Sequence, residues 1–141
     1  MIWNNRMLMA AIIAWAIAQV LKIIIELIRG KKFDFTRFVG SGGMPSSHTS
    51  FTVALCLSIG RHSGWESAIF ALAACFAIVT MYDAANVRRE AGQHAEILNY
   101  MMDHWKNAPK LFENDLKELL GHTYPEVLGG IAVGVVVGLL V

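Results

Sequence analysis

The sequence predicts an all-α integral membrane protein, a bundle of about four membrane-embedded helices with one or two amphipathic surface helices. Two observations predict this class. The 141-residue chain is 55% hydrophobic and only 16% charged, and its apolar residues gather into blocks instead of recurring at the period of a soluble amphipathic helix. Because the length is that of one domain, we expect residues 1–141 to form a single membrane-embedded unit.

Four segments are long enough, or nearly long enough, to cross a bilayer, which takes about 20 apolar residues. They are residues 7–28, 46–59, 65–82 and 124–141, of which the second is short. The first is interrupted only by Gln19, Lys22 and Glu26. These segments are the expected membrane helices.

The polar stretch 83–123 between the third and fourth segments is too long for a simple turn. Apolar residues recur in it at helical spacing, which predicts two amphipathic helices broken near residues 107–109. Their apolar faces either lie on the membrane surface or pack only on each other. The recurring residues are Ala91, Ala95, Leu98, Met102 and Trp105 in one helix and Phe112, Leu116, Leu119 and Leu120 in the other.

Basic residues are distributed unequally between the two expected membrane faces. Alternating spans leave only Arg6 and Arg61 on one face, and the other ten lysines and arginines gather on the face of the 83–123 insertion. By the positive-inside rule that face is cytoplasmic, so both termini lie outside. We expect a multi-pass protein of the cell inner (plasma) membrane. The net charge of +1, without basic stretches carrying stacking aromatics, excludes nucleic-acid binding.

Gly130, Gly134 and Gly138 are spaced four apart in the last segment and form a smooth stripe that allows another helix to approach closely. The stripe is explained equally by contact within the same bundle and by a homodimer.

Lys22 and Arg29 are separated by two helical turns, so they point to the same side of the first helix. A lysine at membrane depth indicates a functional site, because its burial is expensive unless it pairs or lines a wet cavity. Glu26 lies between them and offers an alternative, a ladder of charges that neutralise one another.

The stretch from Gly40 to His48 has the features of an anion site. Its glycines allow tight turns, and Ser46 and Ser47 open a helix whose first amide groups favour phosphate or a similar oxyanion. His48 can donate a proton to a leaving oxygen. The alternative is a serine-capped helix start with an incidental histidine.

Two further stretches on the same face complete the candidate site. Arg88 or Arg89, after the third segment, can bind phosphate oxygens. His122 precedes Glu126 by four residues, so the carboxylate can orient the imidazole for attack on phosphorus. A metal site is the competing use of the histidines, from Glu90, His94 and His104, but no HExxH-like signature is present. We expect neither a metal nor another cofactor.

Together these residues resemble the type-2 phosphatidic acid phosphatases and the related vanadium haloperoxidases, specifically a small divergent membrane branch of that group. The family pattern is a lysine and an arginine separated by six residues, then Pro-Ser-Gly-His, then Ser-Arg followed by a histidine three residues before an aspartate. Lys22 and Arg29 match the first element, and residues 45–48 match the second. The resemblance implies an all-helical fold, a phosphohistidine at His122, proton donation by His48 and phosphate binding by Lys22, Arg29 and either Arg88 or Arg89.

The sequence departs from the family pattern at several positions. Ser47 replaces a glycine, Glu126 replaces an aspartate, and more than thirty residues split the third element. His94 stands six residues after Arg88, the spacing of an unsplit element, but Leu98 then occupies the position of the carboxylate. His122 with Glu126 is therefore the preferred nucleophile and orienting group.

Three functions are compatible with these observations. The first is a metal-independent phosphatase acting on a phosphomonoester or diphosphate carried by a lipid or isoprenoid tail. The second is a membrane module that binds anionic headgroups without turnover. The third is a structural glycine-zipper oligomer whose charges only set its topology.

Overall fold

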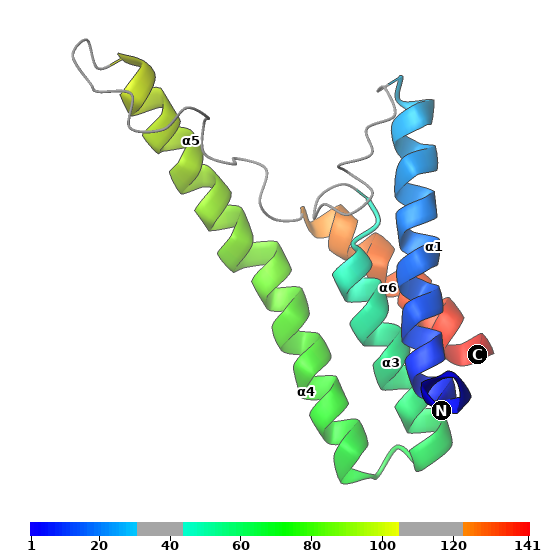
Figure 1. The fold of residues 1–141 in the computed structure, drawn as a ribbon. Coiled ribbons are helices and arrows are strands. Elements are labelled where there is room, and N and C mark those ends of the chain that lie inside the picture. The colour runs from blue at the N-terminus through cyan, green and yellow to red at the C-terminus, as the bar shows by residue number, and fades with distance from the viewer. Residues whose placement is uncertain (31–43, 105–122) are drawn as a thin grey trace.

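The structure, a computed structural model, describes residues 1–30, 44–104 and 123–141, and every regular element in these ranges is helical (Figure 1). The predicted all-α class is confirmed. In chain order the elements are the 3-10 helix η1 (Ile2–Asn4), α1 (Arg6–Ile28), α3 (Ser47–Ser63), α4 (Ala68–Tyr82), the π-helix η2 (Asp83–Val87), α5 (Arg88–His104) and α6 (Tyr124–Leu140).

Helices α1, α3 and α6 pack against one another and form the core of the bundle. α1 and α3 run side by side in opposite directions, and both chain ends lie at the same end of the bundle (Figure 1). Ala14 of α1, Ala54 of α3 and Val137 of α6 meet in the centre, each at most 5% exposed. Such small side chains let helix backbones approach closely, which favours helix association inside a membrane.

The glycine stripe of α6 faces α3 of the same chain. A Cβ atom added at Gly134 would lie 2.7 Å from the Val53 Cβ atom, and Cβ atoms at Gly130 and Gly138 would come within 2.6 and 2.9 Å of α3. These distances are too short for any side chain, so the glycines are what permits the two helices to touch. Contact within the bundle therefore accounts for the stripe, which gives no argument for a homodimer.

The third segment continues without interruption into the polar stretch. Its helix begins at Ala68, where the Ser67 hydroxyl accepts a hydrogen bond from the Phe70 N–H at 3.2 Å. α4, η2 and α5 then form one helix of 37 residues, about 55 Å long at 1.5 Å per residue, that leads away from the core (Figure 1). The first amphipathic helix is thus an extension of the third segment and not a separate element.

The residues buried on α5 are Gly92, Ala95 and Asn99. Ala91 and Leu98 of the predicted apolar row are exposed, and Ala95 is its buried member. The break near residues 107–109 and the second amphipathic helix lie outside the described residues.

Two helices among the described residues are long and apolar enough to cross a membrane, α1 and the long helix Ala68–His104. α6 is apolar but shorter. α4 is apolar on every side, and the side that faces away from α3 is exposed, which suits a lipid environment because such a helix is normally buried or membrane-embedded. The exposed residues of α4 include Ile69, Leu72, Phe76, Ile78 and Val79.

Two contacts fix the end of the bundle that carries the chain termini. The Arg61 guanidinium of α3 donates hydrogen bonds to the carbonyl oxygens of Gly138 and Leu139, which belong to the last turn of α6 and lack intrahelical partners. The Trp65 ring lies against Gly60, so closely that a Cβ atom there would meet it at 2.4 Å. The α3–α4 connection and the end of α6 are thereby tied to α3.

We predict that Gly134→Leu destabilises the protein by about 1–3 kcal/mol or more, because the new side chain pushes α6 away from Val53 and the α3 backbone. Thermal unfolding in detergent measures the effect. Ala132→Leu adds a comparable side chain on the exposed side of α6 and serves as the control. Equal unfolding temperatures for the two variants would contradict the observed packing.

Candidate functional site

The starts of α3 and α6 are joined by hydrogen bonds. The Ser46 N–H donates to the carbonyl oxygen of Glu126 at 3.0 Å, and the Ser50 hydroxyl donates to the carbonyl oxygen of Gly130 at 3.1 Å. Both acceptors lie in the first two turns of α6. Ser46 of the first predicted motif and Glu126 of the second, 80 residues apart in sequence, therefore meet at one end of the bundle.

The start of α3 is buried among other helices. Ser46 is the N-cap residue, and its hydroxyl oxygen accepts a hydrogen bond from the Thr49 N–H at 3.4 Å. Ser46 is fully buried and Ser47 is 2% exposed, whereas His48 is exposed. The Ser46 hydroxyl thus satisfies the Thr49 amide, and the positive end of the helix dipole at this end of α3 favours an anion. Ser46 and Ser47 are thus placed as predicted, at a helix start.

Lys22 lies at the height of this helix start. Ala14 of α1 and Ala54 of α3 meet in the core, and the two helices run in opposite directions. Lys22 follows Ala14 by eight residues, and Ser46 precedes Ala54 by eight residues. Both therefore lie about the same distance along the bundle from the Ala14–Ala54 contact. The Lys22 side chain is only 1% exposed. The predicted lysine and the predicted helix start therefore occupy one layer of the bundle.

Two carboxylates interact electrostatically with the Lys22 ammonium group, Glu26 from the next turn of α1 and Glu126 from the start of α6. The Glu26 interaction agrees with the charge ladder that the sequence left open. Glu126 was not part of that predicted ladder, because it belongs to another helix and adds a second negative charge near the same lysine. Lys22 of α1 is therefore near enough to Glu126 of α6 for their charges to attract each other.

Glu126 also stabilises the start of its own helix. Its Oε2 atom accepts a hydrogen bond from the N–H of Thr123, the N-cap residue, at 3.1 Å. The pattern Thr-x-x-Glu is a known signature of helix starts, and the sequence could have revealed this role. His122, which Glu126 was predicted to orient, lies outside the described residues.

The described arginine side chains of the predicted site are exposed. Arg29 is the exposed C-cap residue of α1, and Arg89 is exposed in the first turn of α5. Arg88 begins α5, but its side chain lies outside the described part. The preceding helix η2 contacts α6, so the arginines follow directly on a segment that touches the helix of Glu126.

The alternative histidines occupy α5. Glu90 and His94 are exposed on this helix, and the ring of His104 stacks on Tyr100 with 4.0 Å between the ring centroids. Within residues 1–30, 44–104 and 123–141, no three His, Cys, Asp or Glu side chains are grouped in a way that could hold a metal ion.

Two buried polar residues of this region were missed as site candidates in the sequence. Gln19 is 2% exposed and Thr49 is fully buried. Gln19 stands three residues before Lys22 in an otherwise apolar helix, and this spacing, which places the two on one side of the helix, could have identified it. Thr49 follows His48 in the first turn of α3 and carries no comparable signal in the sequence.

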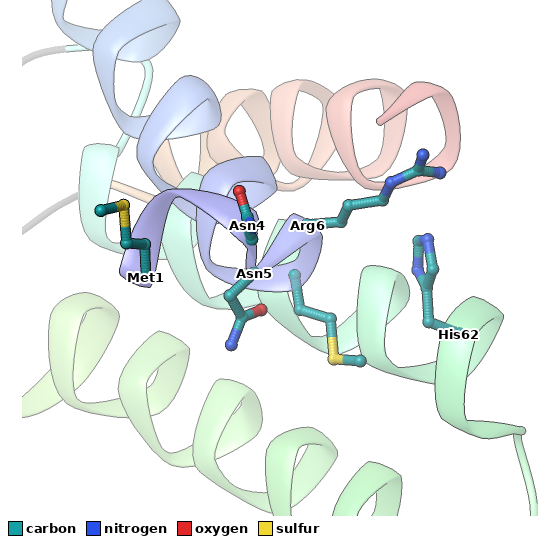
Figure 2. Close-up of a pocket in the computed structure, with 6 residues that line it drawn as sticks. Met1, Asn4, Asn5, Arg6 and His62 are labelled. Atoms are coloured by element: carbon teal, nitrogen blue, oxygen red, sulfur yellow. The ribbon is translucent and has the colours of Figure 1, made fainter.

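A separate hollow of about 510 Å³ lies at the opposite end of the bundle. Figure 2 shows Arg6 and His62 at this hollow, together with Asn4 and Asn5 near the start of α1. Met1 and Met7 complete its lining. The hollow contains none of the predicted site residues, so it is distinct from the Lys22 layer.

The fold and its charges define a class of protein: a helical membrane protein that holds a buried lysine, two carboxylates and a helix start at one end of its bundle. Residues 3–137 match the Divergent PAP2 family, and the chain belongs to this family. The resemblance found in the sequence is thereby confirmed over nearly the whole chain.

A curated relative supports the membrane class. The chain is 36% identical over 148 residues to the Uncharacterized membrane protein YuiD of Bacillus subtilis (strain 168), and the match covers 97% of this chain and 94% of that protein. No solved structure matches the chain. Family and relative together identify a membrane protein related to phosphatases.

We predict that Glu126→Ala lowers stability by about 0.5–2 kcal/mol, because both the hydrogen bond to Thr123 and the charge beside Lys22 are lost. Glu126→Gln should cost less, since its amide oxygen can still accept the Thr123 N–H. Thermal unfolding in detergent compares the two, with Glu66→Ala as the control at an exposed glutamate. If Glu126→Gln lowers the unfolding temperature as much as Glu126→Ala does, the hydrogen bond at the helix start contributes nothing to stability.

Proposed function

We propose that the protein is a membrane-embedded, metal-independent phosphatase that hydrolyses a phosphomonoester or diphosphate carried by a lipid or isoprenoid tail. The observation that carries this proposal is the burial of Lys22 at the height of the α3 start, beside Glu126 of α6. Membership of the Divergent PAP2 family supports the phosphatase class.

The physical argument begins with the burial of the Lys22 ammonium group. A charged group inside a membrane protein is costly unless it pairs or serves a ligand. A helix start beside it adds amide groups and the positive end of a helix dipole, and both favour an oxyanion. Phosphate, with several acceptor oxygens and a negative charge, matches this combination.

In the proposed reaction a nitrogen of His122 attacks phosphorus and the bond to the leaving oxygen breaks. His48 donates a proton to that oxygen, and water then hydrolyses the phosphohistidine. Lys22 and Arg29 bind the phosphate with Ser46, Ser47 and either Arg88 or Arg89, while the Glu126 carboxylate orients His122. The cations stabilise the charge that develops in the transition state.

The membrane setting supports a substrate with a hydrocarbon tail, because α1 is long and apolar enough to cross a membrane. Ile24, Leu27 and Ile28 of α1 are 45%, 52% and 79% exposed, and at about 100° per residue they lie on the side of the helix opposite the buried Lys22. They are suited to contact lipid, so the proposal of a lipid-linked phosphate rests on the membrane setting and not on a groove beside Lys22.

One observation favours a second function, binding of anionic headgroups without turnover. The Glu126 carboxylate already accepts the Thr123 N–H and interacts with Lys22, so orienting His122 would be a third role for one side chain. A binding module needs Lys22 and the start of α3 but neither His122 nor its orientation.

For both functions we propose a multi-pass protein in the inner membrane with the site on the cytoplasmic face. The support is the basic asymmetry of the sequence together with the placement of both chain ends at the end of the bundle away from Lys22 (Figure 1).

Purified protein in detergent, with a chelator present, should release phosphate from lipid or isoprenoid phosphates, and His122→Ala should abolish the release. His94→Ala should retain it and is the matched control. Phosphate release from a panel of such substrates measures the outcome. Turnover that depends on His94 instead, or on an added metal, would contradict the mechanism, and no release from any substrate would favour the binding module.

The proposed topology predicts opposite labelling of two single cysteines. With Cys56 and Cys75 replaced by alanine, Ser63→Cys should react with a membrane-impermeant maleimide in intact cells, because the α3–α4 turn lies outside. Gln93→Cys on α5 should react only after permeabilisation. The reverse pattern would place the site on the outer face.

A further inference from the structure

Two buried side-chain atoms have no hydrogen-bond partner among the described residues: Oε1 of Gln19 on α1 and Oγ1 of Thr49 on α3. Gln19 is 2% exposed and Thr49 is fully buried. Native proteins rarely leave buried polar atoms unpaired, because the lost hydration is not replaced. Two such atoms in one region of a small bundle indicate that something else fills their hydrogen bonds.

Both atoms belong to the region of the proposed phosphate site. A step of five residues leads from Ala14 to Gln19 and from Ala54 to Thr49, so the two residues lie at about the same height of the antiparallel helices. Gln19 is three residues from Lys22 on the same helix, and such residues are neighbours on a helix surface. Thr49 belongs to the first turn of α3, whose start favours an anion.

The two atoms differ in what they can bind. A glutamine carbonyl oxygen only accepts hydrogen bonds, so its missing partner must carry an O–H or N–H group. A threonine hydroxyl can donate to a phosphate oxygen. A fully ionised phosphate offers acceptors alone and would leave Gln19 unpaired, but a terminal phosphate with one proton offers a P–O–H group as well.

The charges around Lys22 favour the same singly charged form. Glu26 and Glu126 both interact with the Lys22 ammonium, and both repel a phosphate dianion more strongly than a monoanion. A terminal phosphate has its second pKa near 6, so the protonated form is accessible close to neutral pH.

We infer that Gln19 determines specificity at the phosphate site proposed above, on which this inference rests: its Oε1 accepts a hydrogen bond from the P–O–H group of a terminal phosphate. The Thr49 hydroxyl donates to another oxygen of the same phosphate. A phosphodiester has no P–O–H group and leaves Gln19 unpaired. The site therefore rejects the phosphodiester headgroups of ordinary membrane phospholipids, which surround the protein in large excess.

The test uses two ligands that differ in this hydrogen. Decylphosphonic acid and its monomethyl ester both carry one negative charge at pH 5.5, and the phosphorus–carbon bond of neither is open to phosphatase cleavage. Calorimetric titration of the detergent-solubilised protein should give about tenfold tighter binding of the acid. Gln19→Met, which keeps the size but not the carbonyl, should remove this preference, and Gln19→Leu should do the same.

Two further variants are the controls for this titration. Gln93→Met makes the same change at an exposed glutamine of α5 and should keep the tenfold preference. Thr49→Val should weaken the binding of both ligands to a similar extent, because the Thr49 hydroxyl contacts an oxygen that both ligands possess.

The outcomes separate this inference from the proposed site itself. If Gln19→Met still binds the acid tenfold more tightly than the ester, as the wild type does, the preference is only steric. The proposed role of Gln19 is then refuted, while the phosphate site is not. A wild type without preference overturns the inference as well. If Lys22→Met binds both ligands as the wild type does, the phosphate site itself is refuted.

Discussion

The close approach of α6 to α3 is the constraint on which the rest of the structure depends. Because Gly130, Gly134 and Gly138 carry no side chains, the α6 backbone lies directly against α3. This contact brings the starts of the two helices to the same height, where the Ser46 N–H reaches the Glu126 carbonyl oxygen. A larger residue in the stripe would separate the two motifs that the proposed site requires.

Once α3 and α6 are fixed, α1 adds the charge. Its alanines pack into the core, and the same close packing carries Lys22 to the level of Ser46 with almost no exposure. Glu26 and Glu126 offset part of the cost of burying the ammonium group. Since two carboxylates face one buried lysine, their formal charges sum to −1 and the layer has no surplus positive charge of its own. The proposed phosphate site therefore requires the start of α3 and the predicted arginines as well as Lys22.

Much of this arrangement was predictable from local sequence patterns. The apolar blocks predicted helices α1, α3, α4 and α6, and Lys22 with Arg29 together with residues 45–48 identified the family. The continuity of α4 with α5 was missed because the sequence turns from apolar to polar near Asp83, although no proline or glycine interrupts the helix before Gly92. The change from apolar to polar residues was interpreted as the end of one helix, although the helix continues through it.

Other features required three dimensions. A glycine stripe has the same sequence pattern whether its partner helix belongs to the same chain or to another chain. Only the observed contact of Gly134 with Val53 shows that the partner is α3 of the same chain. The burial of the unpartnered atoms of Gln19 and Thr49 results from the packing of several helices against one another. The spacing of residues within one helix cannot predict it. The capping role of Glu126, in contrast, was readable from Thr123 three residues before it.

Whether Lys22 and the start of α3 form one phosphate site can be measured by NMR of the isotope-labelled protein in detergent. On titration with inorganic phosphate, the amide signals of Ser47, His48 and Thr49 should shift together and saturate, and Lys22→Met should abolish the shifts. Shifts confined to Arg6 and His62, at the hollow of Figure 2, would contradict such a site by placing the anion at the other end of the bundle.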